Sequence, residues 1–220
     1  MKEKVRVCAE LAAVFIAICA LAGFSDNIVK LGNTVPLKIA LTILVYAAMT
    51  AIPYLICLAK KITFSELGYK KGEIKSQLFA GIGIFLVIFG LTVILPLLLG
   101  TDKSEVLSFK CTTPGRLAFY LFFDFLFVGF GEEFIFRGYF MRRLDAAFHS
   151  ETAALVLSSV LFGLWHYPHN HNVLQVLTTS VIGLFYGLSL SRIKDCSLLS
   201  VSIAHGLQDS AIMLFSYFLL

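Results

Sequence analysis

The stretch Gly131–Arg137 places two adjacent carboxylates and an arginine at the end of a run that is otherwise almost wholly apolar. Ionisable groups within membrane-like sequence are costly and usually mark a functional site. On a helix, Glu133 and Arg137 are four residues apart and can form an ion pair. Glu132 points about 100° away from Glu133 around the helix, which leaves its carboxylate free for proton transfer. The alternative is a structural salt bridge with one glutamate that reaches the membrane edge.

Two further hydrophobic segments carry histidines. One ends in Phe162-Gly-Leu-Trp-His166, and the last one holds His205 and Asp209, four residues apart. On a shared helix face, Asp209 can accept a hydrogen bond from one nitrogen of His205 and fix its tautomer. Each feature taken alone is also an ordinary buried polar residue or pair. With a rise of about 1.5 Å per residue, Glu132, His166 and His205 reach overlapping depths, where apolar helices could enclose one ordered water.

The remaining polar residues of these segments are interpreted as structural. Asp124 lies two turns before Glu132 and is expected to pair or to hydrate a cavity within the bundle. Three histidines follow one another closely, but Pro168 is expected to break the helix. His169 and His171 would then lie in a short outer loop rather than in a metal site.

The composition is that of a polytopic membrane protein. Of the 220 residues, 58% are hydrophobic and 15% are charged, whereas a soluble domain has roughly 25% charged residues. The net charge of +4 is spread over short loops. No basic face interleaved with aromatic residues occurs, so we expect the lipid bilayer and not nucleic acid as a partner.

Seven segments are apolar enough to be membrane helices, which need about 20 mainly apolar residues. They are residues 7–24, 36–59, 77–100, 116–143, 151–167, 172–190 and 197–219. We therefore expect an all-α, polytopic membrane helix bundle with about seven transmembrane helices, forming one domain over residues 1–220. The pattern Gly183-Leu-Phe-Tyr-Gly187 predicts that its helix approaches a neighbour closely.

The distribution of lysine and arginine predicts the orientation. With the N-terminus inside, 13 of the 18 basic residues fall on the inner side, which is the bias of cytoplasmic loops. The N-terminus is therefore predicted to be cytoplasmic. Small loops and the lack of an organelle signal favour a multi-pass protein of a plasma membrane.

Three motifs in order make a specific signature. They are Glu132-Glu133-x-x-x-Arg137, Phe162-x-x-x-His166 and His205-x-x-x-Asp209, on successive hydrophobic segments within residues 116–215. This arrangement resembles the CPBP family. Its members are intramembrane proteases related to the Ras-converting CAAX endopeptidases and to bacteriocin-processing or immunity proteins. The first three segments resemble the family only in being hydrophobic.

The resemblance implies an intramembrane endopeptidase that hydrolyses a peptide bond of a membrane-associated protein or peptide. Glu132 would be the general base, taking a proton from a water that His166 also holds. Burial in a low-dielectric cavity makes a carboxylate a better proton acceptor. Glu133 and Arg137 would form a supporting pair.

The same resemblance implies that His205 and Asp209 face the oxyanion of the tetrahedral intermediate, which needs preorganised donors. Ionised aspartate cannot donate a hydrogen bond. We therefore assign the donor role to His205, as an imidazolium, and the orienting role to Asp209. A protonated Asp209 is the other solution.

The metal requirement stays open at this stage. Glu132, His166 and His205 could supply three zinc ligands with water as the fourth. No histidine pair with four-residue spacing is present among them, and the second carboxylate already has an arginine. We expect no obligatory cofactor, with zinc as the alternative.

Two other classes of function remain. The first is a catalytically inactive membrane scaffold or bacteriocin-immunity protein that keeps the motifs as structure. The second is a small proton-coupled transporter, since intramembrane carboxylates relay protons, but the sequence lacks the inverted repeats and paired broken helices of such proteins. The identity of the substrate, including whether it is prenylated, is not encoded in these motifs.

Overall fold

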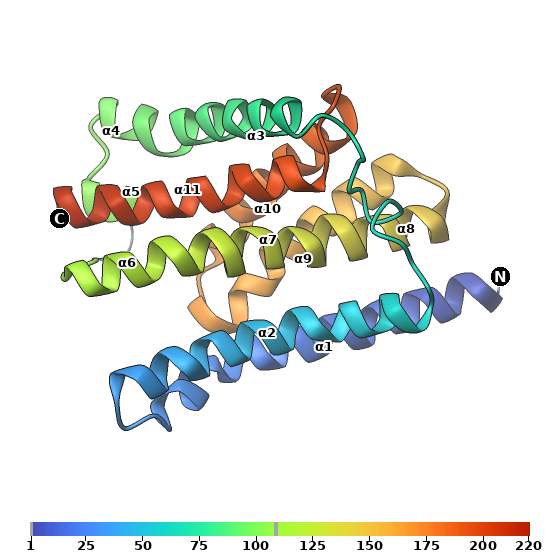
Figure 1. Ribbon diagram of the computed structural model, residues 1–220, viewed down its shortest axis with the longest axis horizontal. Coiled ribbons are helices and arrows are strands. Elements are labelled where there is room, and N and C mark those ends of the chain that lie inside the picture. The colour runs from blue at the N-terminus through green and yellow to red at the C-terminus, as the bar shows by residue number, and fades with distance from the viewer. Residues whose placement is uncertain (1, 108–109) are drawn as a thin grey trace.

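The computed structural model describes residues 2–107 and 110–220, and within these ranges every regular element is a helix (Figure 1). Elements labelled η are π-helical. In chain order they are α1 (Lys2–Lys30), α2 (Val35–Ala59), α3 (Ile74–Phe89), η1 (Gly90–Ile94), α4 (Leu95–Leu98), α5 (Lys103–Leu107), α6 (Pro114–Phe123), η2 (Asp124–Gly129), α7 (Phe130–Glu133), η3 (Phe134–Phe140), α8 (Met141–Phe148), α9 (Glu151–Asn170), α10 (Val173–Arg192) and α11 (Leu198–Leu219).

The all-helical architecture is confirmed, whereas the count of seven spans stays a prediction. Among the described residues, five helices are long and apolar enough to cross a membrane: 2–30, 35–59, 74–98, 173–192 and 198–219. The fourth and fifth predicted segments are helical but lie outside this set. Residues 114–148 form one continuous helical rod with charged groups at its centre, and α9 carries buried serines.

The helices pack so that α11 lies at the centre of the bundle. It contacts α3 on one side and the α6–η2–α7 rod on the other, and α1 and α2 form an antiparallel pair beyond that rod (Figure 1). Its apolar window is 50% buried, against at most 28% for the other four candidate spans. Helix α11 is therefore the candidate span that the protein encloses most, although Leu214 and Phe218 stay exposed near its C-terminal end.

Side-chain caps fix where several helices begin. Thr34, Thr113, Ser150 and Asn172 each accept a hydrogen bond from a backbone N–H three residues on, at the starts of α2, α6, α9 and α10. Such caps satisfy N–H groups that have no partner within the helix. The caps therefore help to set the position of each helix along the chain.

The rod of residues 114–148 changes its winding on both sides of Glu132 and Glu133. The π-helical segments η2 and η3 flank the short α7, and every residue of η3 is buried. The π-helix is rare and is frequently found at functional sites. This change of winding sets the direction in which the two glutamates project.

A glycine contact brings η2 against α11. A Cβ atom at Gly129 would lie 2.6 Å from the Cα of Gly206 and 2.8 Å from the carbonyl oxygen of Ser202. A Cβ atom at Gly206 would lie 2.9 Å from the carbonyl oxygen of Phe125. The two backbones are thus in direct contact, next to His205 and one turn before the glutamates.

The predicted close approach at Gly183 and Gly187 is confirmed. A Cβ atom at Gly183 would lie 2.6 Å from Nη2 of Arg137, and one at Gly187 would collide with the side chain of Leu155. The small residues of α10 therefore make room for the buried arginine and for α9.

The expectation that Pro168 breaks its helix is wrong. Helix α9 continues through Pro168 to Asn170, which places His169 in the last turn. Proline removes one backbone donor, and here the helix ends only two residues later, so little more is lost. His171 follows as the C-cap with φ 50°, outside the helix as predicted.

We predict that Gly129→Ala and Gly206→Ala each destabilise the protein by about 1–3 kcal/mol, because the added methyl group must push two backbones apart. Thermal unfolding of the purified protein in detergent measures this effect. Gly83→Ala is the matched control, since its Cβ would meet no heavy atom within 4 Å and alanine favours a helix. If Gly129→Ala unfolded at the same temperature as the control, the close contact would be disproved.

Candidate active site

Glu133 and Arg137 form the predicted ion pair. Nη1 of Arg137 donates to Oε1 of Glu133 over 3.0 Å, and both side chains are completely buried. The guanidinium also lies over the ring of Phe162, at 4.4 Å from its centroid. Arginine is suited to such buried positions because its charge is delocalised and stacks on aromatic faces.

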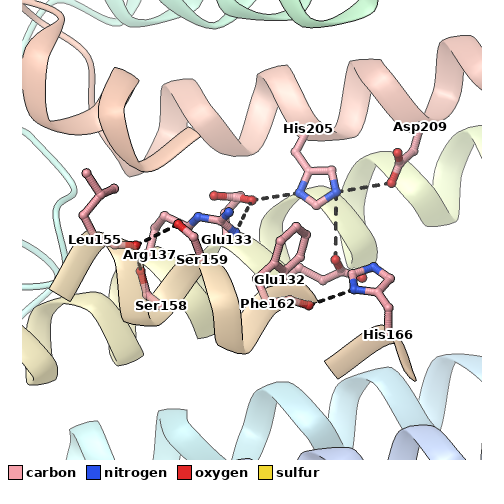
Figure 2. A network of polar contacts seen from close by, with 10 residues as sticks. All are labelled: Glu132, Glu133, Arg137, Leu155, Ser158, Ser159, Phe162, His166, His205 and Asp209. Carbon is pink, nitrogen blue, oxygen red and sulfur yellow. Dashed lines mark hydrogen bonds and ion pairs between the residues drawn. The ribbon is translucent and has the colours of Figure 1, made fainter. Parts of the chain in front are cut away.

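Glu133 also binds His205 on α11. Nδ1 of His205 lies 2.9 Å from the same Oε1 atom that Arg137 contacts (Figure 2). The imidazole stacks on the ring of Tyr186, with centroids 5.2 Å apart. The residue predicted to be a supporting partner therefore positions the histidine, and it links the α7–η3 region to α11.

The other nitrogen of His205 faces two further carboxylates. Nε2 lies 3.4 Å from Oδ2 of Asp209 and 3.9 Å from Oε2 of Glu132 (Figure 2). The predicted proximity of His205 and Asp209 is thus present. The shortest contact of the imidazole, however, is with Glu133 and not with Asp209.

His166 is held by its own helix. Its Nδ1 lies 2.8 Å from the carbonyl oxygen of Phe162, so Nδ1–H donates there and Nε2 is left as an acceptor. The ring packs edge-on against Phe162 and Trp165. The interaction with the backbone fixes the tautomer, which the spacing alone did not reveal.

One carboxylate oxygen of Glu132, Oε2, faces His205 but forms no hydrogen bond in the described structure. Its side chain is buried, and its Oε2 has no hydrogen-bond partner in the described part of the chain. Buried polar atoms are nearly always hydrogen-bonded in native proteins, so this atom marks a place for a water or a substrate group.

Glu132 and His166 line a common cavity of about 340 Å³. Its wall includes aromatic and apolar side chains of α1, α2, α6 and α9. The exposed residues of the lining, Asp26, His169 and Asn170, come from the C-terminal parts of α1 and α9. The cavity therefore leads from that end of the bundle down to the glutamate.

The proposed zinc ligands do not converge into a metal site. In the part of the chain that the structure describes, no three His, Cys, Asp or Glu side chains form a group able to hold a metal ion. The bonds at Nδ1 of His205 and of His166 leave each Nε2 as the remaining ring nitrogen, but these atoms do not form such a group with Glu132 in the described geometry. We derive no step through a metal from this geometry.

Two features of the site were missed by sequence reasoning. One is the Glu133–His205 bond, for which no local pattern exists because the residues are far apart in the chain. The other is Tyr186, which is fully buried against His205. It lies between Gly183 and Gly187, so the small-residue pattern of α10 was the available signal.

One family model matches the part of the chain that contains this site. Residues 114–211 match a family model described as Rce1-like, Type II CAAX prenyl endopeptidase. This segment belongs to the CPBP family. The matched CPBP segment contains all three motifs, and it supports a membrane protease. No curated protein and no solved structure gives a significant match to the chain.

We predict that Arg137→Met destabilises the protein by about 1.5–3 kcal/mol, because Glu133 loses the charge-assisted hydrogen bond from Arg137 and keeps only the bond to His205. The double variant Glu133→Gln/Arg137→Met recovers part of this loss, since the buried charge is removed as well. The stability of the single and of the double variant is measured by unfolding in mixtures that contain increasing amounts of a denaturing detergent. A double variant as unstable as the sum of the two single variants would contradict the pairing.

Proposed function

We propose that the protein is an intramembrane endopeptidase that hydrolyses a peptide bond of a membrane-associated protein or peptide. The observation that carries this proposal is the buried, unpartnered Oε2 of Glu132, on a glutamate that shares a cavity with His166. Oε1 of Glu133, the neighbouring carboxylate, is engaged by both Arg137 and His205, whereas its Oε2 has no hydrogen-bond partner in the described structure. Glu133 does not line the cavity and Glu132 lines it beside His166, so Glu132 is the one suited to proton transfer.

In this mechanism a water lies between Glu132 and Nε2 of His166. Glu132 takes one proton of the water while its oxygen attacks the scissile carbonyl carbon, and His166 accepts the second O–H as a hydrogen bond. The C–N bond of the tetrahedral intermediate then breaks, and Glu132 returns the proton to the leaving amine. A positioned general base of this kind contributes about 10²–10⁴-fold to the rate.

His205 is proposed as the oxyanion donor. As an imidazolium it donates from Nδ1 to Glu133 and carries a second N–H on Nε2, beside Asp209 and Glu132. The stacking of Tyr186 and the bond to Glu133 hold this donor in place before the reaction. Preorganised donors of this type are worth about 10²–10³-fold in kcat.

The substrate is proposed to enter as an extended segment through the cavity that ends at Glu132. The apolar and aromatic wall suits hydrophobic side chains. If the N-terminus is cytoplasmic and the protein lies in a plasma membrane, as the basic residues predict, the cavity faces the outer side. A substrate whose scissile bond lies near that surface would fit.

A catalytically inactive scaffold or immunity protein is the second candidate. The observation that favours it is the buried Arg137–Glu133–His205 network, which ties helices together without any chemistry. Under this candidate, Glu132→Gln would leave the biological function intact.

We predict that the purified protein cleaves members of a membrane-peptide library in detergent, and that His166→Ala lowers the rate by about 100-fold or more. Mass spectrometry of the products measures cleavage. His169→Ala is the matched control, because His169 lies one turn on in α9 and lines the same cavity, but is more exposed than His166. Full cleavage by the His166 variant would contradict the proposed role of this residue.

We also predict that cleavage survives a strong zinc chelator, because water activation is assigned to Glu132 and His166 without a metal. The rate before and after dialysis against the chelator is the measurement. Activity that is lost on chelation and restored by zinc would reassign Glu132, His166 and His205 as metal ligands.

A further inference from the structure

A second, basic pocket lies at the other end of α1, away from the proposed active site. It has a volume of about 410 Å³ and is lined by Lys2, Glu3, Arg6, Val7, Lys60 and Arg143. These residues come from the first two turns of α1, the C-cap of α2 and α8. In Figure 1 the N-terminal end of α1 and α8 lie at the same end of the bundle.

Glu10 binds two of the residues that line this pocket. One carboxylate oxygen accepts from Nη2 of Arg143 over 3.1 Å and from the hydroxyl of Tyr139 over 3.0 Å. The other oxygen lies 2.8 Å from Nζ of Lys60. Lys60 and Arg143 thus share one carboxylate as their ion-pair partner.

The charges around the pocket do not balance. Lys2, Arg6, Lys60 and Arg143 bring four positive charges, against the carboxylates of Glu3 and Glu10. Within the described residues, neither Lys2 nor Arg6 lies within ion-pairing distance of a carboxylate. Nε of Arg143 is buried and has no hydrogen-bond partner. Like charges held together in this way repel one another, which an anion in the pocket would relieve.

The surroundings favour a lipid as the source of that anion. Val5 and Leu58, which are close in sequence to Arg6 and Lys60, are 63% and 54% exposed. Large apolar side chains that are exposed on a membrane protein face the acyl chains of the lipids. Lys4 lies over the ring of Phe148 at 4.1 Å, so the first turn of α1 is attached to the end of α8. A phosphate at headgroup level would therefore contact the basic side chains while its acyl chains follow the apolar surface.

We infer that the pocket formed by Lys2, Arg6, Lys60 and Arg143 binds the phosphate of an anionic phospholipid. The site is independent of the proposed peptidase activity. Basic residues near a membrane surface each contribute about 1 kcal/mol to the binding of anionic lipid. Loss of two of them should weaken binding by about 25-fold, or about fivefold for each residue.

The experiment titrates the intact purified protein with phosphatidylglycerol, and with phosphatidylcholine of the same acyl chains, and counts bound lipid by native mass spectrometry. The variant Lys2→Ala/Arg6→Ala removes two cations that make no ion pair in the described structure. Lys30→Ala/Lys38→Ala is the matched control, because it removes the same charge from the opposite ends of α1 and α2. Circular dichroism and thermal unfolding check that all variants are folded.

The inference predicts that phosphatidylglycerol binds more tightly than phosphatidylcholine, that Lys2→Ala/Arg6→Ala loses about 25-fold in affinity, and that the control keeps the wild-type affinity. Equal binding of both lipids, or equal losses in both double variants, would overturn it. A further titration uses inorganic phosphate. Binding of phosphate without binding of the lipid would overturn the assignment to a lipid.

Discussion

The carboxylate of Glu133 is the group on which the rest of the site depends. One of its oxygens accepts hydrogen bonds from Arg137 on its own helix and from His205 on α11. A buried charge is tolerated only when it is paired and hydrogen-bonded, so this contact fixes how the α7–η3 region is rotated toward α11. Oε1 of Glu133 is engaged by both partners, and Glu132 is the carboxylate that lines the cavity beside His166. The two adjacent glutamates therefore have different surroundings.

Close packing of the backbones allows the contact between Glu133 and His205 to form. Gly129 and Gly206 let η2 and α11 touch, which places His205 beside the glutamates one turn farther on. The π-helical segments on either side of α7 change the direction in which the glutamates project. On the opposite side, Gly183 leaves room for the guanidinium of Arg137. Charges buried in a membrane bundle must be kept away from lipid, and the central position of this network provides that.

Sequence reasoning predicted the features that depend on local spacing and on composition. The helical architecture, the Glu133–Arg137 pair and the proximity of His205 to Asp209 follow from the four-residue repeat and the apolar content, and the structure has all three. The Glu133–His205 bond was not predictable, because it depends on how two distant helices are rotated against each other. The same holds for the π-helical turns, which have no signature in the sequence. Pro168 was misjudged because only two helical residues follow it, so the distortion that proline causes displaces little of the helix.

The most direct test compares Glu132→Gln with Glu133→Gln, measuring the cleavage rate and the unfolding temperature of each purified variant side by side. The two changes are chemically identical and occur at adjacent positions. The account predicts that Glu132→Gln loses cleavage but unfolds at the wild-type temperature, whereas Glu133→Gln lowers the unfolding temperature, because it weakens the bonds to Arg137 and His205. A Glu132→Gln variant that cleaves at the wild-type rate, or that is the less stable of the two, would contradict the central claim.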